Sequence, residues 1–349
     1  MQGFDYQSWL TDAPVTGASV DTSGRVAAFA GGDGVVRLAS LCSERALLPP
    51  RPLSDGAILA LAPDCHSGSF LAGADDGAVY RFDAHGADKT LLRLRRAWPD
   101  QLLAHGRGIL AVADGPDVQL LDGMGEPTGV LGAHPSTVAG LVFDQDGQRL
   151  AVSHYDGVSI WQLSDCDRTT QLRHRGSHLD IVWSPDGRYV VTSTQEKMLH
   201  AWDLHTDTDL SLGPSFNKVK SLGWSADGAW LLAAGNDTLS AWQFTSEGLP
   251  GPAPKMLGRF SEDLIGGVCP HPLLPVVAVA YNDGALDLTA ISMRSERAQL
   301  VAPDAASVVA MAWSPDGDHL IGGKRTGEIF VYRLDEGFLK RLSPDCSRP

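Results

Sequence analysis

The sequence predicts an all-β fold in which one three-strand unit is repeated eight times along 349 residues. The first observation is a recurring turn, Trp-Ser-Pro-Asp-Gly, at 183–187 and 313–317, with related turns at intervals of about forty residues. The second is the pattern after each turn, namely a short apolar run, a tight turn and another apolar run. A repeat of this length is typical of propellers and solenoids.

The unit over 138–163 shows the layout of one repeat. Its apolar and β-branched runs are separated by turns that end in Asp146-Gly147 and Asp156-Gly157. Asp-Gly pairs favour tight turns because they tolerate the positive φ that such turns require. We therefore expect strands over 138–143, 149–153 and 158–163.

Eight such units begin near 15, 57, 98, 138, 178, 219, 264 and 308. The residues between units are sufficient for a fourth, outer strand, so we predict one domain over 1–349, a β-propeller of eight four-stranded blades. The unit near 98 is degenerate, which leaves seven blades as the alternative. We expect residues 4–10 to close the ring as the outer strand of the last blade. Residues 338–342 are the competing candidate.

Composition limits the classes of partner. The chain has 28 Lys and Arg against 42 Asp and Glu, a formal net charge of −14, which disfavours nucleic acid and anionic membrane surfaces. The first residues have no secretory signal pattern and no apolar run could span a membrane. The cysteines are scattered and odd in number, which favours free thiols and a reduced, cytoplasmic protein. We also expect the chain to be a monomer. The cysteines are Cys42, Cys65, Cys166, Cys269 and Cys346.

The turns and the third-strand tryptophans Trp161, Trp202 and Trp242 resemble those of the WD-repeat (WD40) family. That resemblance implies a histidine, nine residues before the aromatic of the first strand, that pairs with a turn aspartate and the third-strand tryptophan. Two units have this histidine. The structural polar network implied by the resemblance comprises His134, Ser153, Asp156, Trp161, His174 and Trp202.

A narrower resemblance rests on the stretches 153–157, 176–179 and 194–202. They are similar to a proteobacterial group of WD-repeat proteins often encoded beside a CobW-type GTPase of metal homeostasis. This resemblance implies a bacterial cytosolic protein, with that GTPase as a candidate partner.

No catalytic motif is evident. The sequence has no phosphate-binding glycine loop, no HExxH, no GxSxG and no CxxC. We therefore expect a non-catalytic scaffold that binds protein partners. An enzyme acting in a central channel is the weakest hypothesis, since only His178 is an evident channel candidate.

Units four and five depart from the repeat at four residues, His154, His178, Glu196 and His200. Imidazole nitrogens with a carboxylate suit zinc, so the alternative function is a metal or ligand site between these units. The narrower resemblance implies that such a site would serve metal homeostasis. The competing interpretation is a polar network between blades that needs no metal, with Glu196 and His174 in place of the family's Asp–His pair. His271, in a Pro-His-Pro turn, is expected to be solvated.

Overall fold

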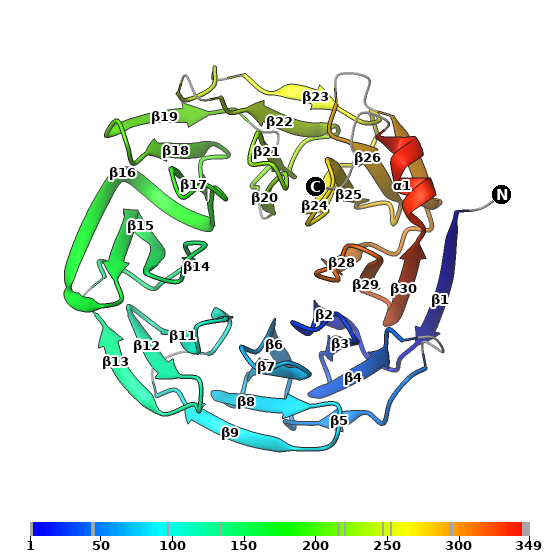
Figure 1. The fold of residues 1–349 in the computed structure, drawn as a ribbon, viewed down its shortest axis with the longest axis horizontal. Coiled ribbons are helices and arrows are strands. Elements are labelled where there is room, and N and C mark those ends of the chain that lie inside the picture. The colour runs from blue at the N-terminus through cyan, green and yellow to red at the C-terminus, as the bar shows by residue number, and fades with distance from the viewer. Residues whose placement is uncertain are drawn as a thin grey trace.

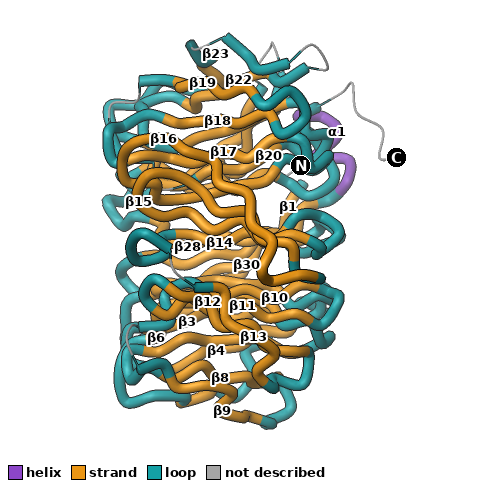
Figure 2. The backbone as a smooth tube through the Cα atoms, turned by 90° about the vertical axis from the view of Figure 1, so that its left-hand side faces the viewer, coloured by secondary structure: helices purple, strands orange, loops and turns teal. Residues whose placement is uncertain are grey.

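The computed structural model describes residues 3–42, 46–95, 98–132, 134–214, 217–219, 221–245, 248–251, 253–292 and 296–343. The strands form a ring of radially arranged sheets, with the chain running once around it (Figure 1). In the side view the sheets follow one another around the ring and the one labelled helix lies near the amino-terminal strand (Figure 2). Cys346 and Ala133 are outside the described residues.

The described residues form seven hydrogen-bonded antiparallel sheets, six of them four-stranded. Three precede the middle of the chain. They comprise β2 (Val15–Val20), β3 (Val26–Gly31), β4 (Val35–Ser40) and β5 (Arg51–Pro52); β6 (Ile58–Pro63), β7 (Ser69–Ala74), β8 (Ala78–Asp83) and β9 (Asp88–Arg93); and β10 (Leu102–His105), β11 (Ile109–Asp114), β12 (Asp117–Asp122) and β13 (Pro127–Leu131).

Two four-stranded sheets lie in the second half of the chain and a third joins the two ends of the ring. They comprise β20 (Leu222–Trp224), β21 (Trp230–Ala233), β22 (Leu239–Gln243) and β23 (Lys255–Leu257); β24 (Ile265–Pro270), β25 (Val276–Tyr281), β26 (Leu286–Ala290) and β27 (Arg297–Val301); and β28 (Val308–Trp313), β29 (His319–Lys324), β30 (Glu328–Leu334) and β1 (Phe4–Leu10).

The remaining sheet has six strands in sequential order, namely β14 (Gly140–Phe143), β15 (Arg149–Gln162), β16 (Asp165–Trp183), β17 (Tyr189–Thr194), β18 (Leu199–Asp203) and β19 (Thr208–Leu212). Two of its strands are long. β15 includes the second and third strands predicted for unit four, and β16 runs without a break from the outer edge of unit four into the first strand of unit five.

Counted as hydrogen-bonded sheets, the described ring therefore has seven blades, which is the alternative count, and the prediction of eight separate four-stranded blades is wrong. The physical reason is the pairing of Tyr155 with Ser177, which continues the β15–β16 ladder past the end of unit four. The degenerate unit near 98 is not where the count fails, since β10 to β13 form a regular sheet.

Hydrophobic packing still follows the repeat inside the six-stranded sheet. Ile160 of unit four and Trp183 and Trp202 of unit five belong to one buried cluster, so the two units pack face to face as neighbouring sheets do. The turn between the unit-four strands requires glycine at Gly157, whose φ is +139° and where a Cβ would lie 2.0 Å from the carbonyl oxygen of Leu172.

The amino-terminal strand closes the ring, as the sequence predicted. β1 pairs antiparallel with β30 over its whole length, from Phe4 opposite Leu334 to Leu10 opposite Glu328. The competing segment 338–342 is not a strand but part of helix α1 (Glu336–Leu342), which begins at the N-cap Asp335. Because β1 covers the edge of β30, the last sheet has no unpaired edge on that strand.

Candidate functional site

Two hollows dominate the described surface, and different residues line each. The first has a volume of about 980 Å³ and is lined by the inner strands, among them Leu59, Ile265 and Val309, so it is the central channel of the ring. The second, about 960 Å³, is lined by unit four and the segments on either side of it, with His134, His154 and Trp161 among the lining residues. Of the four residues at which the sequence departs from its repeat, His154 lines the second hollow, and His178, Glu196 and His200 do not.

In unit four, the predicted histidine–tryptophan pair is in contact. The indole Nε1–H of Trp161 donates to Nε2 of His134 at 3.0 Å, and His134 Nδ1 lies 2.6 Å from the carbonyl oxygen of Pro116. A neutral ring with its proton on Nδ1 satisfies both contacts. Burial lowers the pKa of His134, so this neutral form persists below the usual histidine range.

The other two unit-four residues of the predicted network bind elsewhere. The buried hydroxyl of Ser153 lies 3.5 Å from the Gly140 carbonyl oxygen and 3.4 Å from that of Leu179. Asp156 is exposed, has a φ of +68°, and its Oδ1 lies 3.4 Å from the backbone N–H of Gly176, which donates to it. Asp156 therefore ties the turn to the next unit.

In unit five, three histidines gather. His174 stacks on His200 with ring centroids 3.7 Å apart, and His174 Nδ1 lies 3.4 Å from Nε2 of His178. His178 is fully buried, with Nδ1 at 2.7 Å from the Thr192 hydroxyl and Nε2 at 3.0 Å from the His174 carbonyl oxygen. The ring of Trp202 lies against His178 and His200 instead of bonding His174.

His200 has the most perturbed titration of these histidines. Burial lowers its pKa to about 4, and the electrostatic effect of the neighbouring His174 acts in the same direction. Asp209, whose Oδ2 lies 2.9 Å from His200 Nε2, opposes the shift. Burial also lowers the pKa of His178. These two imidazoles are therefore neutral near pH 7.

The four residues of the predicted metal or ligand site do not form one compact set of ligands. His154 lies 2.9 Å from the Ser159 hydroxyl and 2.7 Å from the Tyr155 carbonyl oxygen, so both of its nitrogens are engaged. Glu196 is exposed and packs over Gly176. A zinc site at His154, His178, Glu196 and His200 stays a prediction.

In the described part of the chain, one group has three metal-ligand atoms within 4.8 Å of one another, namely Asp64, Cys65 and His66. Sequence reasoning missed it because the residues are consecutive and match no spaced motif. Asp64 already pairs with Arg81 Nε at 2.7 Å. Burial and the Asp64 charge raise the pKa of Cys65 to about 11, so the thiol stays protonated near pH 7.

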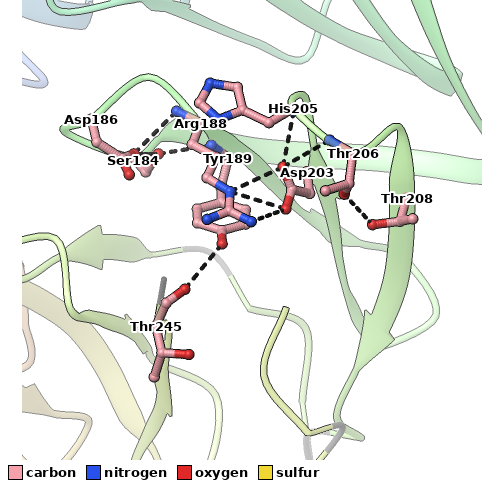
Figure 3. Close-up of polar contacts among 9 residues, drawn as sticks. All are labelled: Ser184, Asp186, Arg188, Tyr189, Asp203, His205, Thr206, Thr208 and Thr245. Carbon is pink, nitrogen blue, oxygen red and sulfur yellow. Dashed lines mark hydrogen bonds and ion pairs between the residues drawn. The ribbon is translucent and has the colours of Figure 1, made fainter. Parts of the chain in front are cut away.

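At the end of the third strand of unit five, an ion pair fixes the turn that follows Trp202. Figure 3 shows Arg188 directed at the carboxylate of Asp203, with Nη2 at 2.6 Å from Oδ2. The backbone N–H groups of His205 and Thr206 donate to the same carboxylate. The Arg188 contact lowers the pKa of Asp203 to about 2. This corner is structural, since its polar groups are satisfied within the fold.

An antiparallel ring closed by its amino-terminal strand, with buried tryptophans between sheets, defines the chain as a β-propeller. Residues 125–161 and 166–203 match the family model described as WD domain, G-beta repeat. The first matched stretch runs from β13 of the preceding sheet through most of unit four and contains the His134–Trp161 pair, and the second reaches the end of the third strand of unit five.

Three relatives resemble parts of the chain. WD repeat-containing protein slp1 of Schizosaccharomyces pombe is 27% identical over 53% of this chain and 40% of its own length. Protein LST8 homolog of Drosophila melanogaster is 24% identical over 55% of this chain and 61% of its own. The mRNA export factor of Sus scrofa is 27% identical over 31% of this chain and 28% of its own length. Each match spans less than two thirds of the relative.

The one helix among the described residues, α1, is not long and apolar enough to cross a membrane.

Proposed function

We propose that the chain is a non-catalytic scaffold of the bacterial cytoplasm that binds a protein partner at the mouth of its central channel. The observation that supports this is a set of exposed apolar side chains on the channel wall or in segments that lead into strands lining the channel. Trp98 is 67% exposed, Phe260 is 75% exposed and Val309 is 37% exposed. Exposed aromatic residues are typical of protein-binding surfaces.

Their positions in the chain support one shared face. Trp98 is in the segment between β9 and β10, two residues before Asp100, and Phe260 is between β23 and β24, four residues before Leu264. Asp100, Leu264 and Val309 all line the channel. In a four-stranded antiparallel blade, the segment that enters the blade and the turn between its second and third strands lie at the same end.

The channel mouth also offers polar groups to a partner. Lys218 and Arg325 line it, and neither side chain has an ion pair within the described residues. A surface with both cations and exposed aromatic rings suits a partner that combines apolar side chains with carboxylates. The candidate partner is a GTPase of the CobW type, and we propose that the chain itself is a monomer.

The test is affinity purification from native cells of the wild type and of a Trp98→Glu/Phe260→Glu variant, with partners identified by mass spectrometry. We expect a protein at near-equal stoichiometry that the double variant loses. Met124→Glu is the matched control, because Met124 is 67% exposed but lies in the turn between β12 and β13, at the opposite end of its blade. Failure to recover a partner with the folded wild type would contradict the proposal.

A further inference from the structure

The hollow lined by unit four and the segments on either side of it, called here the seam pocket, has the size of a small-molecule site. Its volume is about 960 Å³, near the upper end of the roughly 300–1,000 Å³ range of ligand pockets. It is surrounded by Gly132, His134 and Pro135, by the turn at Tyr155 and Asp156, and by the outer segment of β16. The proposed partner surface at the channel mouth uses other residues, so the two sites are independent.

The floor of the seam pocket is rigid and internally satisfied. His134, 6% exposed, is held between Trp161 and Pro116, and His154, 3% exposed, is held between Ser159 and the Tyr155 carbonyl. Because each imidazole uses both of its nitrogens within the protein, neither needs a ligand to complete its hydrogen bonds. These residues therefore shape the pocket, and recognition must come from its walls.

Two arginines on one wall have no anionic partner. Arg173 and Arg175 both line the seam pocket from β16, are exposed, and make no ion pair or side-chain hydrogen bond in the described part of the chain. Elsewhere, arginines such as Arg149 and Arg188 pair with aspartates, as the excess of acidic residues allows. Two unpaired guanidinium groups two residues apart on a strand can approach one ligand from the same face.

The charge balance of the lining residues favours an anion. Two arginines face one carboxylate, that of Asp156, which already accepts the Gly176 N–H, and burial keeps His134 neutral near pH 7. The lining therefore has a net positive charge in a chain whose formal charge is −14. Guanidinium groups bind carboxylate and phosphate groups in a bidentate manner.

The pocket also offers an aromatic surface. Tyr155 lines it and is 46% exposed, although it is in a paired segment of β15. A planar ring in a ligand can stack on such a side chain while an acidic group reaches the arginines. We propose that the seam pocket binds a small planar organic acid, with a carboxylate or phosphate group held by Arg173 and Arg175 and a ring packed against Tyr155.

The test is calorimetric titration of the full chain at low ionic strength with phenyl phosphate, benzoate and inorganic phosphate. We expect saturable binding of one phenyl phosphate or one benzoate per chain. The stronger of the two identifies phosphate or carboxylate as the preferred group. Inorganic phosphate is expected to bind more weakly because it lacks the ring, and Tyr155→Ala should remove that difference.

Arg173→Ala/Arg175→Ala should weaken binding about tenfold or more, as expected for loss of charge-assisted hydrogen bonds. The matched control is Arg168→Ala, which removes an exposed, unpaired arginine of the same strand that does not line the pocket. Each of these variants changes only exposed residues, and an unchanged melting temperature verifies that each variant is folded.

Three results would overturn the proposal. They are no saturable binding of phenyl phosphate or benzoate to the wild type, an equal loss in Arg168→Ala, or binding of a glutamate-rich peptide through Arg173 and Arg175 where both small acids fail. The last result would assign these arginines to a protein partner. Loss of partner recovery by Trp98→Glu/Phe260→Glu with ligand binding intact would separate this site from the scaffold surface.

Discussion

The hydroxyl of Tyr6 donates a 2.8 Å hydrogen bond to Oε1 of Glu328, across 322 positions of sequence. Tyr6 lies on β1, whose seven residues all pair with β30. Glu328 also contacts Lys324 at 2.9 Å, and Lys324 forms an ion pair with Asp304. The two ends of the ring are therefore joined by a strand ladder and by a charged cluster.

Deletion of residues 1–10 should open the ring and expose the edge of β30. We expect a lower unfolding midpoint and concentration-dependent association, because an unpaired strand edge is available for pairing with another chain. Urea unfolding and light scattering measure both effects. Tyr6→Phe is the mild control. It removes one hydrogen bond from a side chain that is 41% exposed and should cost at most about 1 kcal/mol. A deletion variant as stable as the wild type would contradict closure by β1.

Removing the carboxylates around Lys324 should destabilise the closing sheet. Burial alone would lower the pKa of Lys324, which is 3% exposed, but the contacts with Asp304 and Glu328 raise it, so the lysine stays charged. Asp304→Ala/Glu328→Ala should reduce the free energy of unfolding by about 1–3 kcal/mol, the cost of leaving a buried charged group without partners. Adding Lys324→Met should recover part of this loss. No recovery would indicate that the carboxylates act without the lysine.

The sequence predicted the features that depend on local pattern. Closure by residues 4–10 follows from a strand without a partner in its own unit, and the contact of His134 with Trp161 matches the spacing on which the network rests. The blade count depends on pairing between units. The pairing of Tyr155 with Ser177 has no local signature in the sequence. The residues at 155–157 predict only a tight turn, as the corresponding residues of other units do.

The histidine sites depend on side-chain packing, which sequence spacing does not specify. His200 of β18 stacks on His174 of β16, although β17 separates these strands in the sheet, and the spacing of the two residues does not reveal this contact. The prediction of a solvated His271 is wrong. This residue is 1% exposed, since Nδ1 accepts the N–H groups of Leu273 and Leu274 and Nε2 contacts the Gly317 carbonyl. A Pro-His-Pro turn does not reveal that a neighbouring sheet covers it.

Arg188→Gln should destabilise the corner after Trp202. It leaves the carboxylate of Asp203, which is 1% exposed, without its cation. The pKa of Asp203 is about 2 in the folded chain, below the ordinary value of 3.8, so its stabilising effect is present above pH 3.8 and lost as the pH falls through 2. The urea midpoint at pH 7 should fall more than for Arg37→Gln, whose partner Asp33 is 33% exposed. Equal effects would contradict this role of the buried pair.

Acidification should destabilise the chain through His200. Its pKa is about 4 when folded against 6.5 ordinarily, so between these values the unfolded chain binds more protons and acid favours unfolding. The full stability is therefore present above pH 6.5 and is lost progressively towards pH 4. His174, His178 and Asp209 face this imidazole, and Asp209, 55% exposed, moderates the effect.

His200→Gln should abolish about 1–2 kcal/mol of the loss in unfolding free energy between pH 7 and pH 5, because glutamine does not titrate. The measurement is urea unfolding of both chains at the two pH values. His85→Gln, which changes an exposed histidine of another sheet, should leave the pH dependence as in the wild type. If His200→Gln loses as much stability at pH 5 as the wild type does, the acid sensitivity does not arise from His200 and must be sought in the buried His134 and His178.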